Sequence, residues 1–430
     1  MLTDSHYYPS ASRRMVTFGK RGMVATSQSL AAQVGIDILR KGGNAIDAAI
    51  ATAAALTVVE PTSNGIGSDA FALVWVKGEL HGLNASGPAP KSISCDAVKA
   101  LGHDEMPAHG LVPVTVPGAP GAWAALSERF GKLPFEQLLA PAIELADEGF
   151  AVSPVVSQLW KSAEKRYGQY ETAEFTPWFS HFTTNGHAPK AGDIWRSPDM
   201  AKTLSEIASS KADAFYQGNL ADAMDAFSRE HGGFLRKEDL AAYRPEWVDP
   251  ISVRYKGHDI WEIPPNGSGL IVLQALGIIE SISDETKDQV ETLHRRIEAT
   301  KLGYIDGLHY ITERSAMKPS VNQMLSSDYL SQRANLIGQE AIDPIHGNPV
   351  KGGTVYLATA DDEGNMVSFI QSNFEGFGSG IVVPGTGISL QNRGWSFSLD
   401  PQHPNALAPG KRTYHTIIPG FITKDNQAVG

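Results

Sequence analysis

The chain has little cysteine, no long apolar run and no excess of positive charge. One cysteine, Cys95, stands among 430 residues, which excludes an internal disulfide framework and fits a reducing compartment. Lys and Arg total 36 against 47 Asp and Glu, and the resulting net charge of −11 disfavours nucleic acid or an anionic membrane as partner. No run of about 18 apolar residues exists for a membrane span, and the first residues lack the apolar stretch of a signal peptide. We therefore expect a cytoplasmic protein that binds neither nucleic acid nor membranes.

The composition and the apolar patterns are those of a globular protein with mixed secondary structure. Hydrophobic residues make up 42% and charged residues 19% of the chain, and its length fits two or three domains or one large layered domain. Apolar residues recur at helical spacing in segments 28–40, 45–59, 134–147, 270–282 and 293–305. Strand-like patterns cover 71–76, 253–263, 355–360, 366–371 and 417–423. Asn44 is a suitable N-cap for the second helix. Together these patterns predict an α+β fold.

A Gly-Gly-Thr tripeptide, Gly352 to Thr354, directly precedes a strand-like segment and has the features of a self-cleavage point. In such a reaction the Thr hydroxyl attacks the carbonyl before it, and Gly353 permits the close approach and the strained backbone. After cleavage, Thr354 would carry a free α-amine with a pKa of roughly 7.7–8.0, which suits a general base for its own hydroxyl. The alternative interpretation of the tripeptide alone is a glycine-rich turn before an ordinary strand.

Other segments, together with this tripeptide, follow one pattern in the same order along nearly the whole chain. A distinctive one is Val116-Pro-Gly-Ala-Pro-Gly-Ala-Trp123, and another is Gly378-Ser-Gly-Ile-Val-Val-Pro-Gly-Thr-Gly-Ile388. The matching segments are 22–32, 38–49, 58–67, 116–123, 138–150, 352–354 and 378–388. In these motifs the chain resembles the γ-glutamyltranspeptidase family, which includes glutathione hydrolases and glutaryl-cephalosporin acylases.

The resemblance implies a fold, a processing step and a mechanism. The fold would be the four-layer αββα sandwich of N-terminal nucleophile hydrolases, one composite domain made from a large segment, 1–353, and a small segment, 354–430. The precursor would be cut between Gly353 and Thr354, and Thr354 would then attack an amide carbonyl to form an acyl-enzyme. By position, Ser372 matches a family hydroxyl residue that hydrogen-bonds the nucleophile; the alternative is a polar residue on the outer face of a strand. No metal and no cofactor are implied.

The chain departs from the family at the residues that would recognise the substrate. The family binds the substrate α-carboxylate with an Arg, and Ser86 stands at that position. A family Asn two residues beyond the second hydroxyl falls on Phe374. After the amide pair that ends in Asn392, Arg393 replaces an acceptor that binds the substrate ammonium, and Ser396 replaces an Asp.

These departures point to an acyl group with a distal carboxylate. Arg393 offers five donors and no acceptor, so it suits a carboxylate and repels an ammonium. The family's paired Ser falls on His415 and Thr416. We expect glutaryl-type amides as substrates, whereas the competing view keeps γ-glutamyl amides, with Arg393 taking the carboxylate. Because the stretch 398–411, which carries a lid in many members, is short, we expect hydrolysis to exceed transpeptidation.

Two features allow a different outcome. In the family, the strand matching 417–423 is followed by a glycine pair whose N–H groups form the oxyanion hole, and the chain stops at Gly430 before that point. We therefore expect a C-terminal part to be missing from this chain. The altered recognition residues and this absence also allow a catalytically silent relative that acts as a binding or structural protein. The retained Thr354 and Ser372 argue against that alternative.

Other motifs carry weaker signals. Gly65 to Ala70 fits a loose dinucleotide fingerprint but precedes a strand instead of a helix, and residues 266–269 do not complete a nucleophile elbow. His103 and His109 lack metal-ligand spacing, so we interpret their segment as a solvated loop. Trp395, next to Ser396, fits either ordinary strand packing or the wall of a substrate pocket.

Overall fold

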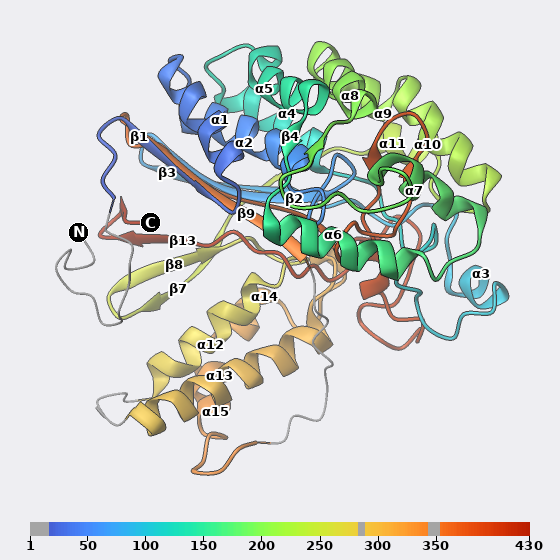
Figure 1. Cartoon of the computed structure of the whole chain (residues 1–430). Coiled ribbons are helices and arrows are strands. Elements are labelled where there is room, and N and C mark those ends of the chain that lie inside the picture. The colour runs from blue at the N-terminus through green and yellow to red at the C-terminus, as the bar shows by residue number, and fades with distance from the viewer. Residues whose placement is uncertain (1–16, 283–288, 343–352) are drawn as a thin grey trace.

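A six-stranded antiparallel sheet lies at the centre of the computed structural model, which describes residues 17–282, 289–342 and 353–430 (Figure 1). The strand order is β1-β9-β10-β2-β3-β6. The strands are β1 (Gly22–Thr26), β2 (Asp69–Val76), β3 (Glu79–Ala85), β6 (Glu246–Val248), β9 (Gly353–Asp361) and β10 (Met366–Phe374). β9 pairs with β1 on one side, and β10 pairs with β2 on the other. The strands that follow residue 353 are thus held between strands from the first part of the chain.

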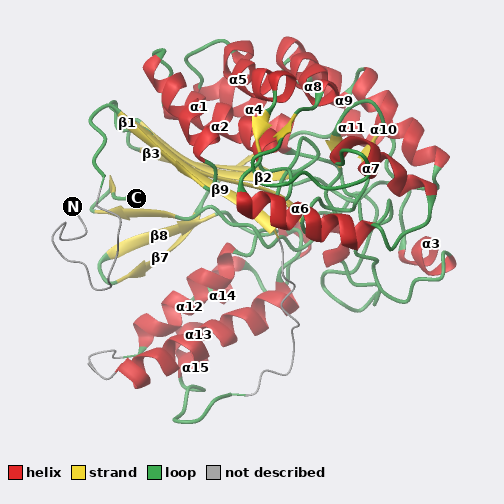
Figure 2. Cartoon of the chain, viewed as in Figure 1, coloured by secondary structure: helices red, strands yellow, loops and turns green. Residues whose placement is uncertain are grey.

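A layer of helices covers one face of this sheet (Figure 2). Its central helix is α2 (Ala45–Val59), all of whose residues are buried, and Asn44 caps it in a capping box with Asp47, which confirms the predicted N-cap. At Gly35 of α1 (Ser29–Arg40) a Cβ would come within 2.3 Å of Thr52 Oγ1, so glycine permits the close contact between the two helices. Around α2 pack α4 (Ala119–Phe130), α5 (Phe135–Glu148) and, outside them, α8 (Pro198–Ser210).

A second sheet packs against the other face of the six-stranded sheet. It has the order β14-β13-β8-β7, and its strands are β7 (Ile251–Tyr255), β8 (His258–Glu262), β13 (Phe421–Lys424) and β14 (Gln427–Ala428). Phe71 and Leu73 of β2 and Ile370 of β10 meet Phe421 of β13 in one buried apolar cluster. Trp75 stacks on Phe421 with ring centres 5.8 Å apart. The two sheets are therefore joined by large side chains that alternate along β2 and β10.

A second group of helices lies on the outer face of the second sheet. Helix α12 (Gly269–Ser281) packs on β7 and β8, and α13 (Gln289–Tyr310) and α15 (Ser327–Ala334) pack on α12, with the short α14 (Val321–Met324) beside α15. Figure 2 shows helices on both outer sides of the two sheets. Each sheet buries one face on the other sheet and one face on helices, which is how a layered α and β fold removes apolar surface from water.

Residues 95–242 contain most of the remaining helices, and their aromatic side chains form part of the core. The helices are α3 (Cys95–Ala100), α6 (Pro154–Tyr167), α7 (Thr176–Phe182), α9 (Asp213–Tyr216), α10 (Asn219–Glu230) and α11 (Lys237–Ala242). Two small sheets pair β4 (Phe150–Ala151) with β5 (Ile194–Trp195) and β11 (Val382–Val383) with β12 (Ile388–Ser389). Trp178 lies 5.3 Å from Phe377 and Trp160 lies 5.5 Å from it, between ring centres. These rings fasten the loop after β10 to the helical layer.

Two predicted strands differ from the observed ones. Segment 253–263 forms the hairpin of β7 and β8 instead of one strand, because Lys256 and Gly257 adopt φ angles of 46° and 77° in a two-residue turn. The alternating pattern continues through the turn and does not mark it. Segment 417–423 becomes a strand only at Phe421; just before the segment, His415 exchanges backbone hydrogen bonds with Asn266 and Ser268 instead of joining the sheet.

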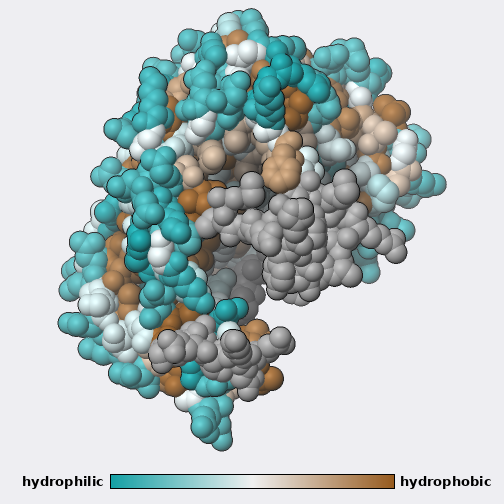
Figure 3. All heavy atoms as spheres, turned by 90° about the vertical axis from the view of Figure 1, so that its left-hand side faces the viewer, coloured by the Kyte–Doolittle hydropathy of each residue, from teal (hydrophilic) through white to brown (hydrophobic). Residues whose placement is uncertain are grey.

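The second sheet leaves part of β1 and β9 uncovered. A shallow cavity of about 160 Å³ lies there, lined mainly by apolar atoms, and Met23 and Tyr356 are exposed beside it. Figure 3 shows hydrophobic residues exposed on this side of the molecule. Among the residues that the structure describes, no helix is both long enough and apolar enough to cross a membrane.

Candidate active site

Thr354 and Ser372 meet at one end of the central sheet. Thr354 is exposed near the start of β9, and its Oγ1 donates a hydrogen bond of 3.1 Å to Ser372 Oγ. Ser372 is fully buried, and its Oγ also accepts the Phe374 N–H at 2.8 Å. The interpretation of Ser372 as a residue on an outer strand face is therefore wrong, because the face that carries it lies between the two sheets. Gly352 lies outside the described residues.

The end of β10 is irregular at this point. Its register with β9 shifts between Gln371 and Phe374, and Phe374 has a φ of 80°, in the left-handed region. This bulge turns the Phe374 N–H back onto Ser372 Oγ instead of leaving it in the ladder. A local distortion thus fixes the hydroxyl that holds Thr354.

Across the other strand pair, Ser372 stands directly opposite Asp69, the first residue of β2. Opposite residues of an antiparallel pair share one face of the sheet, and Phe71 on the same strand points into the cluster between the sheets. The side chains of Asp69 and Ser372 therefore lie on the face that the second sheet covers.

Asp69 binds two of the predicted recognition residues. Its Oδ2 lies 2.9 Å from His415 Nε2 and 3.7 Å from Arg393 Nε, and all three side chains are buried. Burial raises the pKa of Asp69 to about 7, although the Arg393 charge opposes the shift. Burial and the Arg393 charge hold the pKa of His415 well below its usual range. His415 is therefore neutral, and its Nε2–H donates to the Asp69 carboxylate.

Arg393 is enclosed by residues from three segments. Its side chain is 1% exposed, and its NH1 donates to Thr416 Oγ1 at 2.9 Å. The Phe374 ring centre lies 4.2 Å from Arg393 Cζ, so the ring covers the face of the guanidinium. Burial lowers the pKa of Arg393 to about 10, opposed by Asp69, and the group stays charged at neutral pH. Within the described part of the chain, Arg393 Nε and NH2 have no hydrogen-bond partner.

Asn392 and Ser396 make hydrogen bonds that hold the loops around this cluster. Asn392 Oδ1 accepts the Glu375 N–H at 3.2 Å, and its Nδ2 donates to the Ala108 carbonyl at 2.8 Å. Ser396 ends a 3-10 helix, Arg393–Ser396, and its carbonyl accepts Asn405 Nδ2 at 2.7 Å. Of the two interpretations of Trp395, ordinary strand packing is wrong, because the residue lies in this 3-10 helix. The Trp395 ring lies 5.7 Å from that of Phe374.

Ser86 belongs to a neighbouring hydrogen-bond network. Its Oγ donates to Asn84 Oδ1 at 2.7 Å and accepts Asn266 Nδ2 at 3.1 Å, and the Arg412 Nε–H donates to its carbonyl at 3.0 Å. Ser86 is buried, so the position that the resemblance gives to a carboxylate-binding Arg is here filled by a structural hydroxyl. The predicted recognition residues thus fall into a cluster around Arg393 and a separate network around Ser86.

Asp69 is not among the residues that the sequence predicts for the site. It lies in the segment Gly65 to Ala70, whose only motif signal is the loose dinucleotide fingerprint. The available signal was a carboxylate at the start of an otherwise apolar strand, Asp69–Val76, together with a newly introduced Arg at position 393. A buried carboxylate requires a charged or hydrogen-bonding partner, so the two charges could have been paired in advance.

The prediction of a solvated loop is wrong at His109, because this side chain is largely buried and contacts two other residues. The His109 side chain is only 12% exposed, its Nδ1 lies 2.9 Å from Tyr170 OH, and its Nε2 lies 3.3 Å from Glu375 Oε2. In the residues the structure describes, no group of three or more His, Cys, Asp or Glu side chains could hold a metal ion.

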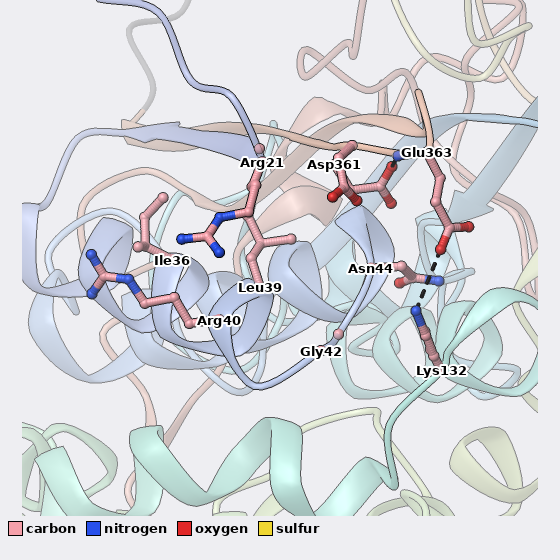
Figure 4. Close-up of a pocket in the computed structure, with 12 residues that line it drawn as sticks. Arg21, Ile36, Leu39, Arg40, Gly42, Asn44, Lys132, Asp361 and Glu363 are labelled. Atoms are coloured by element: carbon pink, nitrogen blue, oxygen red, sulfur yellow. Dashed lines mark hydrogen bonds and ion pairs between the residues drawn. The ribbon is translucent and has the colours of Figure 1, made fainter.

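A pocket larger than the cavity beside Met23 and Tyr356 lies at the far end of β9 (Figure 4). Its volume is about 520 Å³, and its lining includes Arg21, Arg40, Lys132 and Glu363. Lys132 Nζ pairs with Glu363 Oε1 at 3.4 Å, as the dashed line marks. The pocket lies beside Asp361, at the far end of β9 and roughly 23 Å from Thr354, at about 3.3 Å per residue. It is therefore separate from the Thr354 site.

The γ-glutamyltranspeptidase family model matches residues 31–430. The chain belongs to this family. The glutathione hydrolase-like YwrD proenzyme of Bacillus subtilis is 36% identical over 412 residues, which cover 94% of this chain and 77% of that protein. The oxamate amidohydrolase proenzyme of Klebsiella pneumoniae is 36% identical over 406 residues, covering 93% and 75%. A crystal structure of cephalosporin acylase from Bacillus halodurans has a TM-score of 0.95 and 58% identity, covering 100% of this chain and 80% of that one.

Membership of the γ-glutamyltranspeptidase family confirms the predicted family and the prediction of an enzyme. The mixed α and β fold is that of the cephalosporin acylase. Two of the relatives carry the word proenzyme in their names, so they are made as precursors.

Proposed function

We propose that this chain is an autoprocessing amidohydrolase and acyltransferase with Thr354 as its nucleophile. The observation that carries the proposal is the hydrogen bond from Thr354 Oγ1 to Ser372 Oγ, directly after the Gly-Gly pair. The precursor is cut between Gly353 and Thr354 into segments 1–353 and 354–430. Two sheets between two helical layers support the αββα sandwich of N-terminal nucleophile hydrolases.

The chemistry then proceeds through an ester on Thr354. The Oγ attacks the amide carbonyl of the substrate, and its proton passes to the free α-amine of the same residue. The amine half leaves with that proton and the acyl group stays on Thr354 Oγ. Water then attacks the ester and releases the acid. Ser372 orients the Thr354 hydroxyl throughout, because its own Oγ is fixed by the Phe374 N–H.

The substrates are γ-glutamyl or glutaryl-type amides. The names of the relatives, glutathione hydrolase and cephalosporin acylase, support this class. The buried cation of Arg393, with Nε and NH2 lacking a partner in the described residues, supports a carboxylate on the acyl group. Arg393 and Thr416 would bind it next to Asp69, which pairs with Arg393 and with His415. Phe374 would close over the acyl chain.

Hydrolysis exceeds transpeptidation in this proposal. The segment 398–411, where family relatives carry a lid, is short, and its Leu399 and Leu407 pack into an apolar cluster with Ile93 and Val98 instead of reaching across the site. An amine acceptor would therefore find little surface that holds it against the acyl-enzyme, whereas water needs none.

The test is the intact mass of the purified full-length protein after overnight incubation, beside a Thr354→Ala variant. Two fragments separated before Thr354, with the variant uncut, are expected. A single uncut chain in both samples would overturn the proposal and favour the catalytically silent alternative. Comparison of glutaryl-p-nitroanilide with γ-glutamyl-p-nitroanilide then decides the acyl group, and a clear preference for the γ-glutamyl compound would exclude the glutaryl assignment.

A further inference from the structure

Buried polar atoms that lack a hydrogen bond gather on three neighbouring residues close to Ser372. In the described part of the chain, these atoms are Nε and NH2 of Arg393, Oδ1 of Asp69 and Nδ1 of His415, and Arg393 Nε faces Asp69 Oδ2 in an ion pair of 3.7 Å. The three side chains are at most 1% exposed. Unpaired polar groups in a protein interior are costly, so a cluster of them indicates a site that a polar group occupies.

The open atoms define what that group must be. Arg393 presents two donor nitrogens, Nε and NH2, whereas Asp69 Oδ1 and the neutral His415 Nδ1 present acceptors. A substrate carboxylate would accept hydrogen bonds from the Arg393 donors. It would also lie next to the ionised carboxylate of Asp69, and two neighbouring negative charges repel each other. One added proton between the two carboxyl groups removes the conflict, because it turns one oxygen into a donor.

We propose that Asp69 is a proton-linked positioning residue of the acyl subsite: a substrate carboxylate binds Arg393 together with one proton, which it shares with Asp69. The proposal rests on the proposed function, since it specifies how the acyl group of that reaction is recognised. A neutral amide or ketone at the same place would bind without the proton. Because Phe374 lies on the guanidinium, its ring must move aside when the carboxylate enters.

Among the titratable and charged groups around Asp69, only Asp69 itself changes its protonation state near neutral pH. They are Arg393 and His415 in contact, Arg412, which pairs with Glu246 at 2.6 Å, and the tyrosines Tyr216 and Tyr243. Burial raises the pKa values of both tyrosines above their usual range, and His415 stays neutral. Burial also places the pKa of Asp69 at about 7.

These pKa values determine how the affinity for a carboxylate should change with pH. Below about pH 7 Asp69 is already protonated in the free enzyme, so the affinity for a carboxylate does not change with pH. Above about pH 7 the proton must be taken up from solvent, and the affinity falls by about tenfold for each pH unit.

The test uses 5-oxohexanoate, a hydrolysis-resistant glutaryl analogue with a methyl ketone in place of the amide, bound to the wild-type enzyme. Calorimetry at pH 6 to 9, in two buffers of different ionisation enthalpy, gives Kd and the number of protons taken up. At pH 8.5 we expect uptake of about one proton and a Kd at least tenfold weaker than at pH 6. Hexan-2-one, which lacks the carboxylate, is the ligand control.

Asp69→Asn supplies the decisive comparison, because Asn cannot take up the proton. The Kd of this variant should not depend on pH. The control Asp306→Asn changes a buried carboxylate on α13, away from the site, and its Kd should depend on pH as in the wild type. If Asp69→Asn does not fold, the number of protons that the wild-type enzyme takes up on binding still tests the proposal. A Kd that is independent of pH with no proton uptake, or no binding of 5-oxohexanoate at any pH, overturns the proposal even if the chain cleaves itself and hydrolyses amides.

Discussion

The centre of the Phe374 ring lies 4.2 Å from Arg393 Cζ and separates that cation from solvent. The same Phe374 donates its N–H to the hydroxyl that holds Thr354. In the proposed function, one residue on the bulge at the end of β10 would therefore contact both the cation that recognises the acyl group and the hydroxyl that aligns the nucleophile.

Arg393→Lys should weaken selection for a carboxylate while leaving the positive charge beside Asp69. Lysine keeps the charge but loses the planar fork that binds a carboxylate with two hydrogen bonds. We expect kcat/KM for glutaryl-p-nitroanilide to fall by roughly 10- to 100-fold, the worth of one charge-assisted hydrogen bond. Butyryl-p-nitroanilide, which lacks the carboxylate, should change less than threefold. Equal losses on both substrates would mean that Arg393 has only a structural role.

Ser372→Ala should slow self-cleavage. The variant removes the acceptor for Thr354 Oγ1 and leaves the buried Phe374 N–H without its partner. We expect a cleavage rate about 10- to 100-fold lower, measured as intact mass against time. Ser368→Ala is the matched control, since Ser368 is buried on the same strand and bonds Tyr356 OH away from the site. An unchanged rate in Ser372→Ala would remove Ser372 from the mechanism.

Glu262→Gln should stabilise the protein at alkaline pH. Glu262 ends β8, its Oε2 has no hydrogen-bond partner among the described residues, and burial raises its pKa to about 8. The unfolded chain ionises this group near its ordinary pKa of about 4.5, whereas the folded protein keeps it neutral, so stability is lost as pH rises towards 8. We expect the variant to gain roughly 4–5 kcal/mol over wild type at pH 8.5 and little at pH 4.5, by urea denaturation. Equal effects at both pH values would contradict the ionisation account.

Glycylglycine should accelerate product release by less than twofold. Because the short segment 398–411 packs into an apolar cluster, the acyl-enzyme has little surface that could hold an amine in place of water. The measurement is the rate of p-nitroaniline release with and without the dipeptide, under conditions where deacylation limits the rate. Strong acceleration would show that an acceptor site exists and that transpeptidation is the main reaction.

Local signals in the sequence predicted much of the fold. The helix at Ala45–Val59 and its Asn44 cap follow from composition and from a side chain that satisfies free backbone N–H groups, and both depend only on near neighbours. The hairpin of β7 and β8 was missed because the alternating pattern is the same on both sides of Gly257. The order of strands in the central sheet depends on contacts between segments hundreds of residues apart, and no local pattern records it.

The candidate site was predicted residue by residue, but its arrangement was not. Thr354 and Ser372 were paired in advance through the family pattern, and the structure brings their hydroxyls together. Asp69 was missed because its partners Arg393 and His415 lie more than 300 residues away in sequence, and no local pattern records such contacts. Ser86 kept its predicted position but is engaged by Asn84 and Asn266.

The position of β9 between β1 and β10 sets what a cut before Thr354 would do to the molecule. The strand that begins at the new chain end would remain paired on both sides, with β10 of its own fragment and, from Leu357 to Asp361, with β1 of the other fragment. The two pieces could not separate without dismantling the central sheet, so they should co-purify in native buffer and part only in denaturant. Cleavage would then free an amine for chemistry while the architecture stays as the uncut chain built it.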